Sequence, residues 1–220
     1  MFTRTYWRVK KYNILAWLYD VRRYYYRSKR FALADMLMNM SYLYLNPYYI
    51  SRKFSERNKD ASSNTYGETP LKSLEILVDH FNIIKPKKIL ELGCGRGKTL
   101  FWLADRFDVE VVGIEMVPFF VHQANRIKDI CRYNNMKIYR GDMFSFNMSS
   151  FDLIYCYGTC FDDKQIKDLL YSFKMCQRKT KIVTISYPLE DYDKSFTTES
   201  YCEVSFPWGT TMAYLNSHSG

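Results

Sequence analysis

The stretch Lys87-Lys-Ile-Leu-Glu-Leu-Gly-Cys-Gly-Arg-Gly-Lys-Thr-Leu100 decides the fold. Its apolar start predicts a buried strand, the spacing Gly93-x-Gly95-x-Gly97 predicts a turn, and the apolar period that begins at Leu100 predicts a helix. Glycines let the backbone approach a ligand closely, and the start of a helix adds amide donors and a positive dipole end. The stretch therefore predicts a binding site for a nucleotide-like ligand.

An acidic residue, Glu91, precedes these glycines. Neither the G-x-G-x-x-G spacing of dinucleotide sites nor the G-x-x-x-x-G-K-[ST] spacing of P-loops is present. A carboxylate at this place repels a pyrophosphate. It suits a cationic ligand, such as the sulfonium and α-amino groups of S-adenosylmethionine.

Two further acids follow predicted strands. The run 111–115 ends in Glu115, 18 residues after Gly97 (115 − 97), where a carboxylate can accept both ribose hydroxyls. The run 137–141 leads to Asp142, which can accept the adenine amino group while Met143 or Phe144 packs on the ring. The simpler interpretation is that each acid caps a helix or turn. Three acids at successive strand ends favour the cofactor site.

Strand and helix patterns alternate through the rest of the chain, with further strands expected at 151–157 and 181–187. This order predicts a parallel sheet with helices on both faces. Residues 201–206 and 210–215 have strand composition and are expected to close the sheet as an antiparallel pair through Pro207-Trp208-Gly209. The predicted fold class is α/β, a Rossmann-like seven-stranded sheet with an N-terminal helical appendage.

A polar connector, Asp60–Thr65, separates a helical segment (1–60) from the sheet domain (61–220). After it, Thr69 is the predicted N-cap of a helix that has Pro70 as its first residue. Because this helix leads into the first strand, Tyr66-Gly-Glu-Thr69 is expected at the mouth of the cofactor site.

The excess positive charge of the chain lies in residues 1–60, which hold 13 Lys and Arg against 4 Asp and Glu, whereas residues 61–220 hold 19 of each. Two apolar helical stripes are expected to pack on the sheet domain. They consist of Ile14, Trp17, Leu18, Val21 and Tyr25, and of Leu33, Met36, Leu37, Met40 and Leu43. The basic and tyrosine residues between the stripes are an alternative binding surface for nucleic acid or an anionic membrane, or else a solvated helix face.

The composition predicts a compartment and excludes some classes of site. The six cysteines form no C-x-x-C pair, which is typical of reduced thiols in a cytoplasmic protein. The three histidines show no metal-ligand spacing, so no metal site is expected. No run reaches the ~20 apolar residues of a membrane span, and no signal-peptide pattern begins the chain.

From about residue 66 to the end, this pattern resembles the class I S-adenosylmethionine-dependent methyltransferases. Within that class it is similar to the non-SET histone lysine methyltransferases of the disruptor of telomeric silencing type. The similarity rests on Tyr66–Thr69, Glu91–Gly97, Gly113–Glu115, Arg140–Asp142, Val204–Phe206 and Tyr214-Leu215. It implies that Tyr66, Glu68 and Thr69 belong to the loop around the methionine moiety and that Glu91 binds the amino-group side. Gly93, Gly95, Gly97, Glu115, Asp142 and Met143 complete the expected cofactor site.

The same resemblance implies that Tyr155, Phe206 and Tyr214 wall a lysine channel, and we expect Tyr157 and Trp208 beside them. Such a wall favours a neutral lysine by desolvation. One departure is that the family has Asn-Asn after its fourth strand, where this chain has Tyr157-Gly158.

Three functions remain compatible with the sequence. The first is methylation of a protein lysine. The second is a methyltransferase for RNA or a small molecule, although the chain lacks the Asn/Asp-Pro-Pro-Tyr/Phe signature of base-amino methylation after the fourth strand. The third is a non-catalytic binding module. The three acids argue against a module, because a dead site needs no cofactor ligands.

Overall fold

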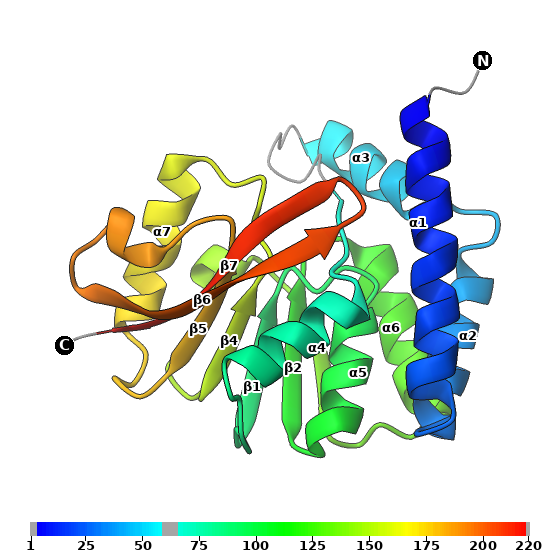
Figure 1. Ribbon diagram of the computed structural model, residues 1–220, viewed down its shortest axis with the longest axis horizontal. Helices are drawn as coiled ribbons and strands as arrows, with labels where there is room; N and C mark the ends of the chain where they lie inside the picture. Colours follow the sequence, from blue (N-terminus) through cyan, green and yellow to red (C-terminus); the bar gives the residue numbers. More distant parts are fainter. Residues whose placement is uncertain (1–3, 59–65, 219–220) are drawn as a thin grey trace.

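The computed structural model describes residues 4–58 and 66–218, and side chains from residue 11 onward within these ranges. Within them, seven strands form one mixed sheet in the order β3-β2-β1-β4-β5-β7-β6 (Figure 1). The strands are β1 Lys88–Leu92, β2 Glu110–Glu115, β3 Met136–Arg140, β4 Leu153–Cys156, β5 Lys181–Ile185, β6 Phe196–Phe206 and β7 Gly209–His218. The first five are parallel, and β7 is antiparallel to β5 and β6. This confirms the predicted fold class.

Helices cover both faces of the sheet, because each central strand is apolar on both sides. On β1, Ile89 packs into one core and Leu90 into the other. The first core lies under α4 Leu71–His80, α5 Lys98–Phe107 and α6 Pro118–Ile130, and the second lies under α7 Asp163–Lys174. The doubly covered sheet leaves the carboxyl ends of its strands free to build a site.

The N-terminal residues form three helices that share the first core. These are α1 Arg4–Asp20, α2 Lys29–Ser41 and α3 Pro47–Asn58, with a π-helical turn at Val21–Tyr25. Helix α2 packs on α5 and α6, and α1 packs on α4 (Figure 1). The segment thus caps the sheet domain, while the predicted connector Asp60–Thr65 lies outside the described residues.

The face by which these helices pack was predicted wrongly. The buried residues of α2 are Phe31, Ala34, Asp35 and Met38, whereas Leu33, Met36 and Met40 are about half exposed. On α1, Ile14, Trp17 and Leu18 are exposed as well. Hydrophobic periodicity favoured the exposed face of α2, because Asp35 makes the buried face less apolar. The pattern does not record that a residue of another element neutralises this charge.

Two boundaries also differ from prediction. Thr69 caps no helix: Pro70 is the N-cap of α4, and the Thr69 hydroxyl instead bonds the Tyr155 hydroxyl. Strand β6 begins at Phe196, five residues before the predicted start at Tyr201 (201 − 196), and contains a register shift at Thr198/Ser200. No helix in 4–58 or 66–218 is long and apolar enough to span a bilayer.

Gly113 on β2 should be intolerant of a side chain. An added Cβ would lie 2.3 Å from Leu100 Cδ1 of α5 and 2.7 Å from Cys94 Sγ of the glycine loop. We expect Gly113→Ala to lower the free energy of unfolding by about 1–3 kcal/mol through overpacking, measured by urea denaturation. Gly141→Ala is the control, because its nearest neighbour, Ile114 Cγ2, is 3.8 Å from the added Cβ. Equal losses in both variants would contradict the prediction.

Candidate active site

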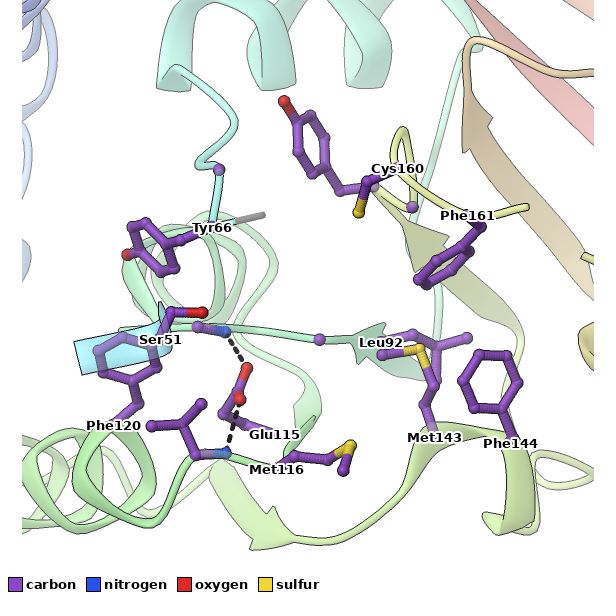
Figure 2. Close-up of a pocket in the computed structure, with 16 residues that line it drawn as sticks. Ser51, Tyr66, Leu92, Glu115, Met116, Phe120, Met143, Phe144, Cys160 and Phe161 are labelled. Atoms are coloured by element: carbon purple, nitrogen blue, oxygen red, sulfur yellow. Dashed lines mark hydrogen bonds between the residues drawn. The ribbon is translucent and has the colours of Figure 1, made fainter. Parts of the chain in front are cut away.

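A pocket lies at the carboxyl ends of the parallel strands, beside the point where the strand order turns from β1 to β4 (Figure 2). Open α/β sheets bind their ligands at such switch points. The lining residues are Ser51, Tyr66, Gly67, Leu92, Gly93, Gly95, Glu115, Met116, Val117, Phe120, Met143, Phe144, Tyr157, Gly158, Cys160 and Phe161.

Glu115 reaches the pocket from the end of β2 and is held there by backbone donors. The Gly95 amide donates to its Oε2 at 2.9 Å, and the Val117 amide donates to its Oε1 at 2.8 Å (Figure 2). Burial raises the pKa of this carboxyl, against the lowering effect of the two amides. Each oxygen keeps a second lone pair, so the carboxylate can also accept hydroxyls from a ligand.

Glu91 lies deeper, on β1. Its Oε1 accepts the Thr99 hydroxyl, whereas its Oε2 is buried and has no hydrogen-bond partner among the described residues. It lines a small cavity with Gly67, Glu68, Thr69 and Tyr157. Burial raises the pKa of Glu91 to about 8, even though the Thr99 hydrogen bond lowers it. An orphaned, desolvated carboxylate oxygen fits a ligand that brings its own cationic donor.

The opposite wall of the pocket is apolar. Met143 and Phe144 line it, and a Cβ at Gly93 would lie 3.2 Å from Met143 Cε, so the glycine lets Met143 lie close to the loop. The preceding Asp142 is exposed, accepts the Phe144 amide at 3.0 Å, and is not among the lining residues. Of the three predicted acids, Glu115 therefore lines the pocket, Glu91 lines the small cavity next to it, and Asp142 lines neither. The bond from Asp142 to adenine stays a prediction.

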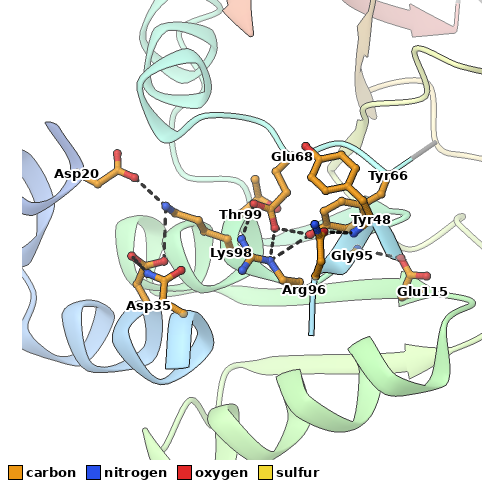
Figure 3. A network of polar contacts seen from close by, with 12 residues as sticks. Asp20, Asp35, Tyr48, Tyr66, Glu68, Gly95, Arg96, Lys98, Thr99 and Glu115 are labelled. Atoms are coloured by element: carbon orange, nitrogen blue, oxygen red, sulfur yellow. Dashed lines mark hydrogen bonds and ion pairs between the residues drawn. The ribbon is translucent and has the colours of Figure 1, made fainter. Parts of the chain in front are cut away.

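A clamp that the sequence did not reveal closes over the glycine loop. The Arg96 guanidinium donates to both carboxylate oxygens of Glu68 at 2.6 Å and lies 5.0 Å from the centre of the Tyr42 ring (Figure 3). Tyr66 donates its hydroxyl to Glu68, and its ring lies against Gly95. Burial alone would raise the pKa of Glu68, but Arg96 lowers it to about 2. Glu68 thus holds the loop through Arg96.

A second missed interaction joins α5 to the N-terminal helices. The Lys98 ammonium lies 2.7 Å from Asp20 Oδ2 and 3.5 Å from Asp35 Oδ1 (Figure 3). Tyr25 also donates to Asp35, at 2.5 Å. The sequence contains one indication of this interaction. Asp20 and Asp35 are the two acids of residues 1–55, and each lies within an apolar helical pattern. Such acids are rarely buried without a cation.

Three of the predicted acceptor residues contact one another beside the pocket, although Tyr157 alone lines it and Phe206 is buried. Trp208 Nε1 donates to the Tyr157 hydroxyl at 2.9 Å. The Phe206 ring stacks on Trp208 with centroids 5.2 Å apart and an interplanar angle of 5°, and it lies 5.2 Å from the Tyr157 ring. The tip of the β6–β7 hairpin thereby forms an aromatic wall.

Two other predicted acceptor residues lie elsewhere. Tyr155 is buried in the first core, and its hydroxyl bonds Thr69 instead of facing the pocket. Tyr214 lies between the core residues Ala213 and Leu215, so strand alternation points it to the opposite face of the sheet, where it pairs with Tyr201. Neither side chain lines the pocket, and their place in an acceptor channel stays a prediction.

The N-terminal segment also contributes to the site. Ser51 of α3 lines the pocket, and the Tyr48 ring of α3 packs edge-on against Tyr66 at 5.3 Å. Cys160 and Phe161, after β4, line it too. Ser51 and Tyr48 carry no motif, so spacing could not identify them, whereas the stretch from Tyr155 to Phe161 is expected at the switch point because it follows the fourth strand. Among the residues described, no group of three or more His, Cys, Asp or Glu could hold a metal ion.

A family model described as a methyltransferase domain matches residues 84–211, which is more than half of the chain. The chain belongs to this methyltransferase family. Its domain is a class I S-adenosylmethionine-dependent methyltransferase, and its cofactor is S-adenosylmethionine.

Relatives of this methyltransferase act on diverse molecules. It is 23% identical over 176 residues to a histone-lysine N-methyltransferase, H3 lysine-79 specific, from Dictyostelium discoideum, covering 73% of this chain and 10% of that protein. It is 36% identical over 58 residues to phosphoethanolamine N-methyltransferase 1 from Arabidopsis thaliana, covering 24% of this chain and 12% of that protein. The chain thus spans about a tenth of these curated relatives.

A solved RNA methyltransferase from Salinibacter ruber, in complex with S-adenosyl-L-homocysteine, superposes with a TM-score of 0.56. The two chains are 17% identical, and the match covers 67% of this methyltransferase and 91% of that chain. A similarity at this level of sequence identity shows a shared fold and nothing about the substrate.

The pocket of the methyltransferase fits its cofactor. The unpartnered oxygen of Glu91 suits the α-amino group, Glu115 offers a carboxylate to the ribose, and the slot beside Met143 suits a flat base. Tyr66 and Gly67 would cover the methionine end.

Binding of the cofactor should release a proton from Glu91. Because its pKa is about 8, the free protein holds this proton at neutral pH, and an ammonium ligand expels it. We expect S-adenosylmethionine to release about one proton at about pH 7, measured by calorimetry in buffers of different ionisation enthalpy. Glu91→Gln should release none and bind about tenfold more weakly. Equal proton release by both proteins would contradict this role.

The same pKa predicts how the stability of the cofactor-free protein changes with pH. The folded protein keeps a proton on Glu91 that the unfolded chain loses above the ordinary glutamate pKa of 4.5. The contribution of Glu91 to the free energy of unfolding should therefore fall as the pH rises from 4.5 to about 8 and then level off. Urea denaturation of the wild type and Glu91→Gln measures the difference, and parallel curves would contradict it.

Loss of Lys98 should loosen the N-terminal helices. In Lys98→Met, two buried carboxylates lose their cation, so we expect the free energy of unfolding to fall by about 3–5 kcal/mol. We also expect faster hydrogen exchange at the backbone amides of α1 and α2. The loss should shrink in acid, where protonation neutralises Asp20, whose pKa burial raises. Lys164→Met, which removes an exposed pair with Asp168, is the control and should change little. Similar losses in both variants would contradict the prediction.

Proposed function

We propose that this domain methylates the ε-amino group of a protein lysine. The observation that carries the proposal is the aromatic wall, in which Tyr157 lines the pocket and Phe206 and Trp208 contact Tyr157. An aromatic wall excludes water and disfavours the ammonium form of an amine, so it lowers the pKa of an entering lysine. The likeness to a histone-lysine methyltransferase across 73% of the chain supports the same acceptor class.

The chemistry requires alignment more than acid–base catalysis. When bound, S-adenosylmethionine supplies an electrophilic methyl group on its sulfonium sulfur. Glu91 and Glu115 would orient the two ends of the site, while Tyr157, held by the hydrogen bond from Trp208, would keep water from the acceptor nitrogen. With the cofactor bound, the lone pair of a neutral amine would form the new N–C bond as the S–C bond breaks, and the product ammonium would lose its proton to solvent.

RNA or a small molecule is the alternative acceptor, and a transfer assay separates these classes. The protein is incubated with a cell lysate and S-adenosylmethionine labelled in the methyl group, and the products are treated with protease or nuclease. We expect protease to destroy the labelled macromolecule and hydrolysis to yield methyl-lysine. Label that is lost to nuclease, or that appears only in small molecules, would overturn the lysine proposal.

The aromatic wall should govern the acceptor and not the cofactor. We expect Trp208→Ala to lower kcat/KM for the protein acceptor at least about tenfold, because it removes the stacked partner of Phe206 and admits water. Its affinity for S-adenosylmethionine, measured by calorimetry, should stay close to wild type. Tyr201→Ala removes an exposed aromatic of the same hairpin away from the pocket and should retain activity. Equal losses in both variants would exclude a role for the wall.

A further inference from the structure

Helix α1 presents an amphipathic face that the fold leaves uncovered. Ile14, Leu15 and Leu18 are each 50–56% exposed. Lys11 and Arg22, both exposed, lie at the two ends of this stripe. Their spacing of three or four residues places Lys11, Ile14, Leu15 and Leu18 on one side of α1, and Arg22 follows in the π-helical turn after its end. Apolar residues therefore occupy the middle of the face and cations its ends.

Helix α2 repeats this arrangement. Leu33, Met36 and Met40 are 46–61% exposed at intervals of three and four residues, and the exposed Lys29 precedes them. We call these α1 and α2 residues together the outer face. Both helices lie at the end of the molecule away from α7 (Figure 1). The opposite sides of the two helices are the ones that pack on α4, α5 and α6.

The charge of the outer face has one sign. Asp20 and Asp35 are turned inward onto Lys98, and the remaining acid among the described side chains of 11–58, Glu56, pairs with Lys53 on α3. Within the described side chains, no ion pair involves Lys11, Arg22 or Lys29. The outer face therefore combines aliphatic side chains with uncompensated positive charge.

We propose that the outer face binds an anionic membrane surface. Aliphatic stripes flanked by Lys and Arg are the pattern of helices that lie in the lipid interface, with the apolar residues among the acyl chains and the cations at the headgroups. A 17-residue helix such as α1 is about 25 Å long and would lie parallel to the surface. Attachment in this way needs no spanning segment.

Two other occupants fit the face less well. A single-stranded nucleic acid is bound by cations and aromatic stacking, whereas the centre of this face is Leu, Ile and Met. A second copy of the chain would bring the same Lys and Arg residues together across a two-fold axis, where like charges repel.

Vesicle sedimentation tests the proposal with the full chain. We expect binding to phosphatidylcholine vesicles that contain phosphatidylserine and little binding to phosphatidylcholine alone. Each basic side chain near an anionic surface contributes about fivefold in affinity, so Arg22→Gln/Lys29→Gln should weaken binding about 25-fold. Leu15→Gln/Leu18→Gln should weaken it at least about tenfold by removing buried apolar area. Unchanged binding in either variant would overturn the proposal.

Matched variants away from the outer face control for net charge and hydrophobicity. Lys167→Gln/Arg178→Gln removes two exposed cations of the α7 region, and Ile84→Gln/Ile130→Gln removes two exposed aliphatic side chains. Both should bind vesicles like the wild type. Circular dichroism and S-adenosylmethionine affinity should show that all four variants remain folded.

Two further outcomes would overturn the proposal. One is equal binding to neutral and anionic vesicles. The other is a different occupant: a fluorescent oligonucleotide bound at physiological salt and lost in Arg22→Gln/Lys29→Gln, or a dimer in sedimentation velocity that is lost in Leu15→Gln/Leu18→Gln.

Discussion

The ion pairs of Lys98 with Asp20 and Asp35 set the arrangement of the N-terminal half of the molecule. Removing three charges from water is costly, and their attraction offsets this cost only when the partners meet closely. Three segments distant in sequence must therefore come together: the end of α1, the middle of α2 and the start of α5. Because Asp35 has to reach Lys98, α2 turns the face of Phe31, Ala34 and Met38 inward. Its other apolar face is left in solvent.

The cofactor pocket depends on the same region. Lys98 follows directly on Gly97, so the pairs that hold the N-terminal helices also hold the glycine loop. Arg96, clamped by Glu68, fixes the loop from its other side. Against this rigid frame, Glu91 keeps one oxygen without a partner in the part of the chain that the structure describes. A buried polar atom left unsatisfied is costly for stability and is typical of sites that a ligand completes.

Local pattern was sufficient for the sheet and for much of the cofactor site. The strand, glycine turn and helix at 87–100, the order of parallel strands, and the hairpin through Trp208 follow from periodicity and turn residues that lie close together in sequence. Glu91 and Glu115 were identified because each occupies a strand end, and parallel strands bring those ends to one edge. Tyr157, Phe206 and Trp208 meet for a related reason, since the hairpin tip returns to that edge.

The sequence by itself therefore determined the elements, the fold and the strand ends that carry Glu91 and Glu115. The tertiary structure alone decided which faces of α1 and α2 are buried, that Thr69 bonds Tyr155 instead of capping a helix, and that Tyr214 lies on the far face of the sheet. It also decided the Arg96 clamp and the contribution of α3 to the pocket. Each of these depends on a partner many residues away, and periodicity does not record whether a charge or hydroxyl finds such a partner.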